Sequence, residues 1–563
     1  MRIWLACAGL LAMATASAAM PLSVPTAAAT PFALVALFDD WRGFVEPAQR
    51  GGVSDYGSAA MLAKATALAG FRARLKRLDR NDWDTAAATD YELIEAEISG
   101  YDFDLRVLRP WARDPSFYRT VFADESDVPA HEGPSAVPAI DLFKLRWPLS
   151  PADHARLTAQ LRSIPRLLAA ARLNLAGGNA RDLWAYGDRT FREQSEVLGA
   201  LGDGKLAMRT LEGAPVATIT GASARLRVAI TDARVATDAF AAWIAVEART
   251  KTGPSGIGKA DYDWYAANVQ RSRYGWAEQM VLLQRELDRS LTSLRLEELR
   301  NRNLPPLAPI ENPAAFRAMA AARTARLNNF LVDTGLVPDR SYFRAALAAQ
   351  TSDYTPLADR NFFSHVTALD PLPLLSHSTH WIELARLKHE PHASPIRRRA
   401  PLFNIFADRS EGFATAMEEV VMQAGLYDDM PRARELVWIM LANRAARGLA
   451  SLRVQANEID LAQAGRFHAE WTPRGWSNPD SPLVGFEQLL YLRQPGYGPS
   501  YIVGKLELDR LIARASQAAD SAGQPFVPGD VFARIVAAGI VPPALIERKM
   551  FGKATPPALP PSR

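Results

Sequence analysis

Helical periodicity is the feature that most constrains the fold of this chain. Apolar side chains recur at intervals of three and four residues, the spacing that places them on one face of an α-helix. Strand-like patterns are limited to two short segments, Ala214–Gly221 and Phe362–Leu369. The sequence therefore predicts an all-α, or nearly all-α, fold with few short strands. The long helical runs are Ala59–Leu78, Ala86–Leu108, Ala152–Leu175, Ala222–Ala248 and Tyr262–Arg300, the last with a break near Gly275.

A proline-rich segment divides this helical pattern. Residues 301–313 contain four prolines, and proline cannot continue a helix because it lacks the backbone N–H and clashes with the preceding turn. We expect an N-terminal helical half over residues 31–300, a seam over residues 301–313 and a C-terminal half over residues 314–552. Residues 553–563, KATPPALPPSR, have the composition of a disordered tail.

The first thirty residues are typical of an exported protein. MRIWLACAGLLAMATASA has one arginine, an apolar stretch too short to span a bilayer, and the small residues Ala16, Ser17 and Ala18. We expect a signal peptide over residues 1–18, cleaved after Ala18, a flexible leader over residues 19–30, and a periplasmic or secreted protein. Cleavage would also remove Cys7, the only cysteine, so the mature chain would have no disulfide.

Charge and hydropathy argue against two classes of protein. Lys and Arg number 65 and Asp and Glu number 61, a balance that gives no electrostatic basis for binding nucleic acid. No segment after the signal peptide approaches the ~18 uninterrupted apolar residues of a membrane span. We therefore expect neither a nucleic-acid binder nor a membrane-spanning protein.

Two histidines lie three residues apart in LLSHSTHWIELARL, which begins at Leu374. On a helix, His377 and His380 would share a face. They belong to a group of five among the eight histidines of the chain, lying between His365 and His392. Such a group predicts either a metal site or a polar cluster that lines a cleft without metal.

Two glutamates follow on one helical face. Glu411 and Glu418 are seven residues apart, two turns, and are flanked by apolar side chains, so their helix is predicted to be largely buried. Buried carboxylates need partners. His380, a metal ion, or Arg444 and Arg447 on the next predicted helix could provide them.

The segment QPGYGPSYIVGK, from Gln494, is predicted to be a loop entering a helix. Gly496 and Gly498 would permit unusual backbone angles, and Tyr497 would lie just before the helix. Tyr501 and Lys505 would follow one turn apart on one face of that helix.

Four segments, in this order along the chain, resemble the bacterial domain-of-unknown-function 885 family, whose members look like zinc metallopeptidases of the zincin type. They are LLSHSTHWIELARL, SEGFATAMEEVVMQAGLYDD, NRAARGLASLRVQ and QPGYGPSYIVGKLELDRL. The resemblance implies a multi-helix zincin-like architecture with a central cleft, zinc as the cofactor if any, and a peptide or small peptide-like ligand. It also implies that Tyr497, Tyr501 and Lys505 line the substrate cleft, where a tyrosine hydroxyl could stabilise an oxyanion.

The first segment departs from the family pattern, which resembles H-E-x-x-P-G-H-H-L-Q. His380 falls on the last metal-binding histidine, but Leu374 and Leu375 fall on the first histidine and the catalytic glutamate. Ser451 and Gln455 also stand where the family has Asp and His. Leucine can neither bind zinc nor accept a proton. The leading hypothesis is therefore a pseudo-peptidase that has lost the standard zinc site and binds peptides or a partner without cleaving them.

Two alternatives remain open. The chain could be an active zinc metallopeptidase with relocated ligands, in which His377, His380 and Glu411 bind the metal and Glu383 or Glu418 is the general base. It could also be a purely structural helical scaffold without a ligand cleft.

Overall fold

The computed structural model describes residues 30–219, 221 and 223–552. Helices make up 66% of the structure and strands 3%, which confirms the nearly all-α fold. The predicted signal peptide, the leader as far as residue 29 and the predicted tail lie outside the described residues. Within the described residues, none of the helices combines the length and the apolar character that crossing a membrane requires.

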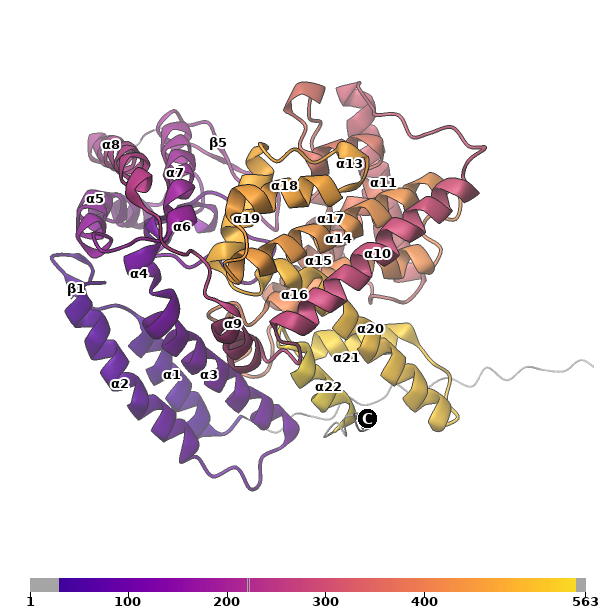
Figure 1. Cartoon of the computed structure of the whole chain (residues 1–563), viewed down its shortest axis with the longest axis horizontal. Coiled ribbons are helices and arrows are strands. Elements are labelled where there is room, and N and C mark those ends of the chain that lie inside the picture. The colour runs from indigo at the N-terminus through magenta and orange to yellow at the C-terminus, as the bar shows by residue number, and fades with distance from the viewer. Residues whose placement is uncertain (1–29, 220, 222, 553–563) are drawn as a thin grey trace, which may run out of the picture.

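The N-terminal helices form two groups, both purple in Figure 1. The first three helices pack around Trp41, whereas α5, α7 and α8 enclose a separate core that contains Phe191 and Phe240. The predicted long helices of this half are confirmed to within a few residues. The elements are α1 (Phe32–Val45), α2 (Ser58–Lys76), α3 (Thr85–Phe103), α4 (Pro110–Arg113), α5 (Pro151–Asn174), α6 (Arg181–Ala185), α7 (Gly187–Gly202) and α8 (Ala224–Glu247).

The strands are short and pair two by two. β1 (Gln49–Arg50) pairs antiparallel with β2 (Val53–Ser54), β3 (Val121–Phe122) pairs parallel with β4 (Ile140–Asp141), and β5 (Leu206–Ala207) pairs antiparallel with β6 (Val216–Ala217). β6 lies inside the predicted strand Ala214–Gly221.

The second predicted strand is wrong, because Phe362–Leu369 is the helix α13. Asn361 caps its first turn by accepting from the backbone N–H of Ser364, whose hydroxyl accepts in return from the N–H of Asn361. Phe362, Val366 and Leu369 then fall at helical spacing and are buried. The cap and this spacing override the strand preference of the aromatic and β-branched residues.

The C-terminal helices surround α17, which is buried along almost its whole length. α10, magenta in Figure 1, runs beside α17 and contributes Leu283 and Leu287 to the same core, although it precedes the seam. These helices are α9 (Lys259–Tyr265), α10 (Trp276–Arg300), α11 (Pro313–Asp333), α12 (Ser341–Ala348), α13 (Phe362–Leu369), α14 (Leu372–His377), α15 (Thr379–His389), α16 (Ala407–Gln423), α17 (Pro431–Gln455), α18 (Leu461–Trp471), α19 (Pro482–Arg493), α20 (Tyr497–Ser521), α21 (Pro528–Ala537) and α22 (Pro543–Phe551).

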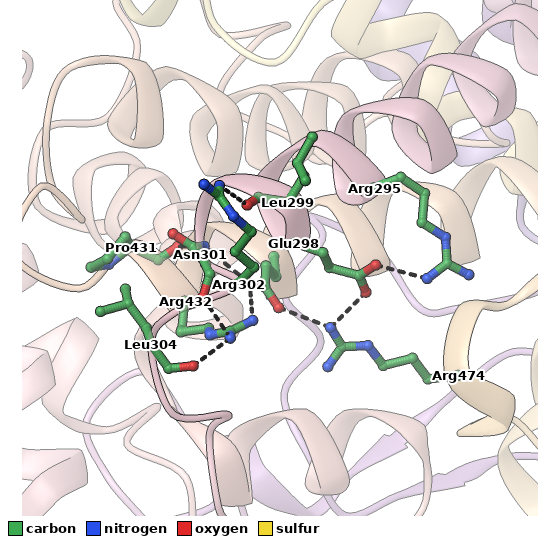
Figure 2. A network of polar contacts seen from close by, with 10 residues as sticks. Arg295, Glu298, Leu299, Asn301, Arg302, Leu304, Pro431, Arg432 and Arg474 are labelled. Carbon is green, nitrogen blue, oxygen red and sulfur yellow. Dashed lines mark hydrogen bonds and ion pairs between the residues drawn. The ribbon is translucent and has the colours of Figure 1, made fainter.

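The seam itself is fixed by polar contacts, shown in Figure 2. Arg432 donates to the carbonyl oxygens of Asn301 and Leu304, at 2.8 and 2.6 Å. Arg474 donates to Glu298 at 2.8 Å. The bonds of Arg432 hold the beginning of the seam against the beginning of α17, and the bond of Arg474 ties α10 to the segment after α18. The seam is thus anchored although it contains neither helix nor strand between α10 and α11.

Two glycines let α16 and α20 approach closely. A Cβ atom on Gly504 would lie 1.9 Å from the carbonyl oxygen of Asp408, and one on Gly412 would lie 2.3 Å from the Cα of Gly504. Backbone therefore packs directly on backbone at this crossing. The crossing brings Glu411 of α16 to the first turn of α20, where Tyr497 lies.

Candidate metal centre

The three ligands predicted for a relocated metal site converge. His377 at the end of α14, His380 in α15 and Glu411 in α16 offer ligand atoms that all lie within 4.8 Å of one another. The Nε2 atoms of His377 and His380 lie 3.5 and 3.6 Å from the same carboxylate oxygen of Glu411. Their ring centroids are 4.7 Å apart. The donor atoms of the three side chains therefore lie close enough together to be candidate ligands of one metal ion.

A break between two helices at Ser378 separates the two histidines. The sequence predicts one helix through both histidines, but α14 ends at His377 and α15 begins at Thr379. Leu375 belongs to the main hydrophobic core, and Leu374 packs against that core. Leu374 and Leu375, which the resemblance aligns with a histidine and a glutamate, are therefore packing residues.

His380 gives the strongest indication that the cluster binds a ligand. Its side chain is 3% exposed, and neither ring nitrogen has a hydrogen-bond partner among the described residues. Buried polar atoms are normally satisfied, so an imidazole with two free nitrogens needs an explanation. Burial lowers the pKa of His380, which favours the neutral imidazole that binds metals.

Glu411 supplies a charged ligand. Burial alone would raise the pKa of its carboxyl group, but the two imidazoles and the Tyr497 hydroxyl outweigh burial and lower the pKa to about 2. Tyr497 donates a hydrogen bond to Oε1 at 2.5 Å. The carboxylate is thus ionised and held in position, while its Oε2 faces both histidines.

Glu418, predicted as a possible base, occupies a supporting position. Its Oε1 lies 2.8 Å from Nδ1 of His377 and 2.6 Å from Arg444, which also donates to Oε2 at 2.8 Å. The prediction that Arg444 partners a buried glutamate is confirmed. A carboxylate behind a metal-binding histidine fixes the orientation of the ring. Burial would lower the pKa of His377, but Glu411 and Glu418 outweigh it and raise that pKa.

Glu383, the other predicted base, is also engaged. It accepts a hydrogen bond of 2.5 Å from Arg409, and both side chains are buried. Arg447 does not reach Glu411 or Glu418 as a hydrogen-bond partner; it pairs with Glu487 and lies 4.3 Å from the ring centroid of Tyr501.

The structure places the predicted cleft residues of α20 differently. Tyr497 is the first residue of the helix, not the residue before it, and Gly496 has the expected left-handed backbone with φ 79°. Gly498 is helical, and its lack of a side chain instead makes room for Ser451, since a Cβ atom on Gly498 would lie 2.8 Å from that side chain. The ring of Tyr501 stacks towards His377 at 6.1 Å.

Lys505 is held outside the cluster. Its ammonium lies 2.9 Å from Glu419, 3.0 Å from Asp509 and 3.5 Å from Glu286, and its side chain is 2% exposed. These three carboxylates fully account for its charge. Lys505 therefore joins α10, α16 and α20 and is not positioned by these contacts to bind a substrate.

The five histidines do not form one cluster. His365 packs on Trp476, and His389 stacks on Tyr342 at 4.5 Å. His392 accepts a hydrogen bond from the backbone N–H of Ser394. Only His377 and His380 converge.

Sequence reasoning missed the segment ADESDVPAHEGPSAVP, residues 123–138, which lies against the cluster. Val128 packs with Tyr497 and Tyr501. The charge of Asp127 acts on His380, and burial followed by the charges of Asp127 and Glu411 raises the pKa of Glu132 to about 8. The only signal in the sequence was an acidic loop with three prolines, a composition that does not reveal its distant neighbours.

The residues present fit a transition-metal ion. Two imidazoles and a carboxylate are one of the ligand sets that hold catalytic zinc, with one position left for water or substrate. Behind these ligands, Tyr497 donates a hydrogen bond to Glu411, and Glu418, which is paired with Arg444, lies 2.8 Å from Nδ1 of His377; metal ligands require partners of these kinds.

No protein-family model matches the chain, and no curated protein matches it either. Its fold is similar to two solved structures. One is a candidate lipoprotein of unknown function from Shewanella oneidensis, with a TM-score of 0.65 and 13% identity, covering 93% of this chain and 100% of that one. The other is a candidate lipoprotein from Colwellia psychrerythraea, with a TM-score of 0.60 and 13% identity, covering 88% of this chain and 91% of that one. At these identities the likeness concerns the fold alone.

Proposed function

We propose that this chain is an exported metal-dependent hydrolase of peptide-like substrates, with relocated ligands. His377, His380 and Glu411 would hold the metal ion. The observation that carries the proposal is the convergence of these three side chains around a buried imidazole whose two nitrogens have no hydrogen-bond partner among the described residues. The resemblance to the domain-of-unknown-function 885 family supports the peptidase class, and the signal-like N-terminus supports export.

The roles of the chain's own residues follow from their contacts. A bound zinc ion would supply Lewis acidity and lower the pKa of a water molecule. Tyr497 orients Glu411, and Glu418 orients His377. The phenol of Tyr501, stacked towards His377, is the donor best placed to stabilise an oxyanion.

The general base in this proposal is Glu132. Glu383 and Glu418 are both neutralised by buried arginines, which makes them poor proton acceptors. No hydrogen bond or ion pair within the described part of the chain engages the side chain of Glu132, and it lies close enough to Glu411 for their charges to interact. Burial and the charges of Asp127 and Glu411 raise the pKa of Glu132 to about 8, and a metal cation beside Glu411 would lower that pKa towards the neutral range in which a general base works.

A second candidate is a peptide-binding protein that does not hydrolyse its ligand. The arginine pairing of both Glu383 and Glu418 favours it, because neither carboxylate proposed for the base from the sequence is free. Under this alternative the histidine cluster would be structural, or would hold a metal without turnover.

Zinc analysis and a hydrolysis assay on the same sample distinguish these two functions. The full chain, purified without chelator, is analysed for zinc and assayed for hydrolysis of a mixed peptide library. The hydrolase proposal expects one zinc per chain and cleavage. It also expects a stabilisation by zinc of about 2.7 kcal/mol at a concentration one hundred times the Kd. Zinc uptake without cleavage supports the peptide-binding protein. If the chain takes up no zinc, neither function involves this metal.

Two variants assign the roles. His380→Ala should abolish zinc uptake, whereas His389→Ala, in the same helix but stacked on Tyr342, should leave it unchanged. Glu132→Gln should keep the zinc but lower the turnover by about 10²–10⁴-fold, the usual effect of losing a general base. Normal turnover in Glu132→Gln would eliminate this residue as the base.

A further inference from the structure

A second site lies beside the metal cluster, in a cavity of about 300 Å³. Its walls come from α1 to α4, from the loop around residues 130–137 and from residues 401–404 and 493–495. None of the three candidate metal ligands lines it. Six aromatic side chains make up much of its wall: Tyr56, Tyr101, Trp111, Phe117, Tyr265 and Phe403.

One carboxyl group in this aromatic wall has no counter-charge. No hydrogen bond or ion pair to the carboxyl group of Asp104 is found within the described residues, and burial alone raises its pKa to about 8. The two basic residues of the wall are already paired. Arg493 lies 2.6 Å from Asp114, and His131 lies 3.0 Å from Asp141. Asp104 is thus a partly buried acid beside aromatic rings, which is costly to ionise unless a cation joins it.

The backbone on both sides of Asp104 is unusual. Asp104 begins a π-helical turn, η1 (Asp104–Leu108), which ends at Arg109 with φ 42°. Across the cavity wall, Phe403 has φ 61°, and a Cβ on Gly100 would come within 2.5 Å of the Phe403 ring. Non-glycine residues rarely adopt such angles, and both these residues and π turns concentrate at functional sites.

An aromatic wall with a single unpaired carboxylate has a specific chemical preference. Aromatic faces attract cations, and aromatic cages are a common means of recognising substituted ammonium groups. We propose that this cavity binds an organic cation, an ammonium or guanidinium group on an apolar body, with Asp104 as its counter-ion. An anionic ligand would face the uncompensated acid, and a purely apolar one would leave it unpaired.

The cavity and the metal cluster share a wall. Gln494 and Pro495 line the cavity, and Tyr497, two residues further on, donates to Glu411. Val128 and Ala130 of the same loop pack around Tyr497, and Ala130 also lines the cavity. The cation would then be the basic end of a peptide-like substrate, a link that rests on the proposed function, whereas the cation site stands on the cavity alone.

The test uses the full chain and benzyltrimethylammonium, whose charge does not change with pH. Binding is measured by calorimetry and by the fluorescence of Trp111 and the other tryptophans, with benzyl alcohol and phenylacetate as the neutral and anionic probes. We expect benzyltrimethylammonium to bind at least tenfold more tightly than either. Equal binding of benzyl alcohol, or no binding of the cation, would overturn the proposal.

A matched pair of variants locates the site. Asp104→Asn should lose at least tenfold in affinity for the cation, whereas Asp102→Asn, paired with Arg72 and Arg106, should not. If Asp104→Asn does not fold, the preference of the unaltered chain among the three probes still decides. Unchanged affinity in a folded Asp104→Asn would contradict the assignment.

Zinc is measured on the same samples, so the two proposals can fail separately. His380→Ala should still bind benzyltrimethylammonium. If the chain binds zinc but not the cation, the proposed function stands and the cation site is refuted. If the chain binds the cation but not zinc, the cation site stands and its link to metal-dependent hydrolysis is refuted.

Discussion

The crossing of α16 and α20 predicts the effect of adding one methyl group at Gly504. In Gly504→Ala the new Cβ would lie 1.9 Å from the carbonyl oxygen of Asp408, about 1.1 Å inside the closest approach that real side chains make. The obstructing atom belongs to the backbone of α16, so no side chain can rotate away. Overpacking of a core costs about 1–3 kcal/mol, and a backbone clash belongs at the upper end of that range.

The expected net loss follows from two opposing terms. Alanine is favoured over glycine inside a helix by about 1 kcal/mol, which offsets part of the clash, so Gly504→Ala should lose about 2 kcal/mol of stability. Separation of the helices would also lengthen the bond from Tyr497 to Glu411 and weaken zinc binding. Urea unfolding followed by far-UV circular dichroism measures the first effect, and a zinc titration measures the second.

A matched substitution in another helix provides the control. Gly70 lies within α2, is exposed, and has no heavy atom within 4 Å of the position that a Cβ would take. Gly70→Ala should therefore gain about 0.5–1 kcal/mol, because only the helix preference acts there. If both alanine variants shift the unfolding midpoint in the same direction, close backbone packing at the α16–α20 crossing is refuted.

Three further predictions concern single side chains. Tyr497→Phe removes the donor to Glu411 and should weaken zinc binding by about 10–100-fold in a competition titration with a chelator; unchanged affinity would show that this hydroxyl does not support the ligand. Arg444→Met leaves Glu418 buried without its cation and should cost about 3–5 kcal/mol in urea unfolding, most of which should return when Glu418→Leu is added. Asp104 keeps its proton in the folded chain up to a pKa of about 8, whereas the unfolded chain loses it near pH 4, so its contribution to stability falls as the pH rises between these values. Asp104→Asn removes this dependence, and its melting temperature relative to the unaltered chain should rise from pH 5 to pH 8; a constant difference would contradict the raised pKa.

The helices were predictable because their determinants are local. Apolar spacing located α2, α3, α5 and α8, and Gly275 marked the beginning of α10. The strand predicted at Phe362–Leu369 failed because eight residues rich in aromatic and β-branched side chains fit both periods. Only the Asn361 cap, which depends on a hydrogen bond formed in the folded chain, separates the two interpretations.

The candidate ligands were predictable for a similar reason. Which carboxylates are free to accept a proton was not predictable. His377 and His380 are close in sequence, and the two-turn spacing of Glu411 and Glu418 places both glutamates on the face that meets His377. Whether a glutamate is free to accept a proton depends on which arginine reaches it. Glu383 meets Arg409 only because α15 and α16 pack together, and no spacing along the sequence reveals such a pair.

If the chain is the proposed hydrolase, a shift of the first ligand would explain why its base must come from another element. His377 follows Leu374 by three residues, so a ligand displaced by nearly one helical turn moves about 4.5 Å along the axis and stays on a similar face. The same displacement carries the glutamate position from Leu375 to Ser378, whose hydroxyl is a poor proton acceptor at neutral pH. The chain can thus keep its ligands by moving one of them, but it cannot keep its base in the same way. The proposed hydrolysis would then require a carboxylate from another element, and Glu132, in a loop more than two hundred residues earlier, is the candidate that we propose.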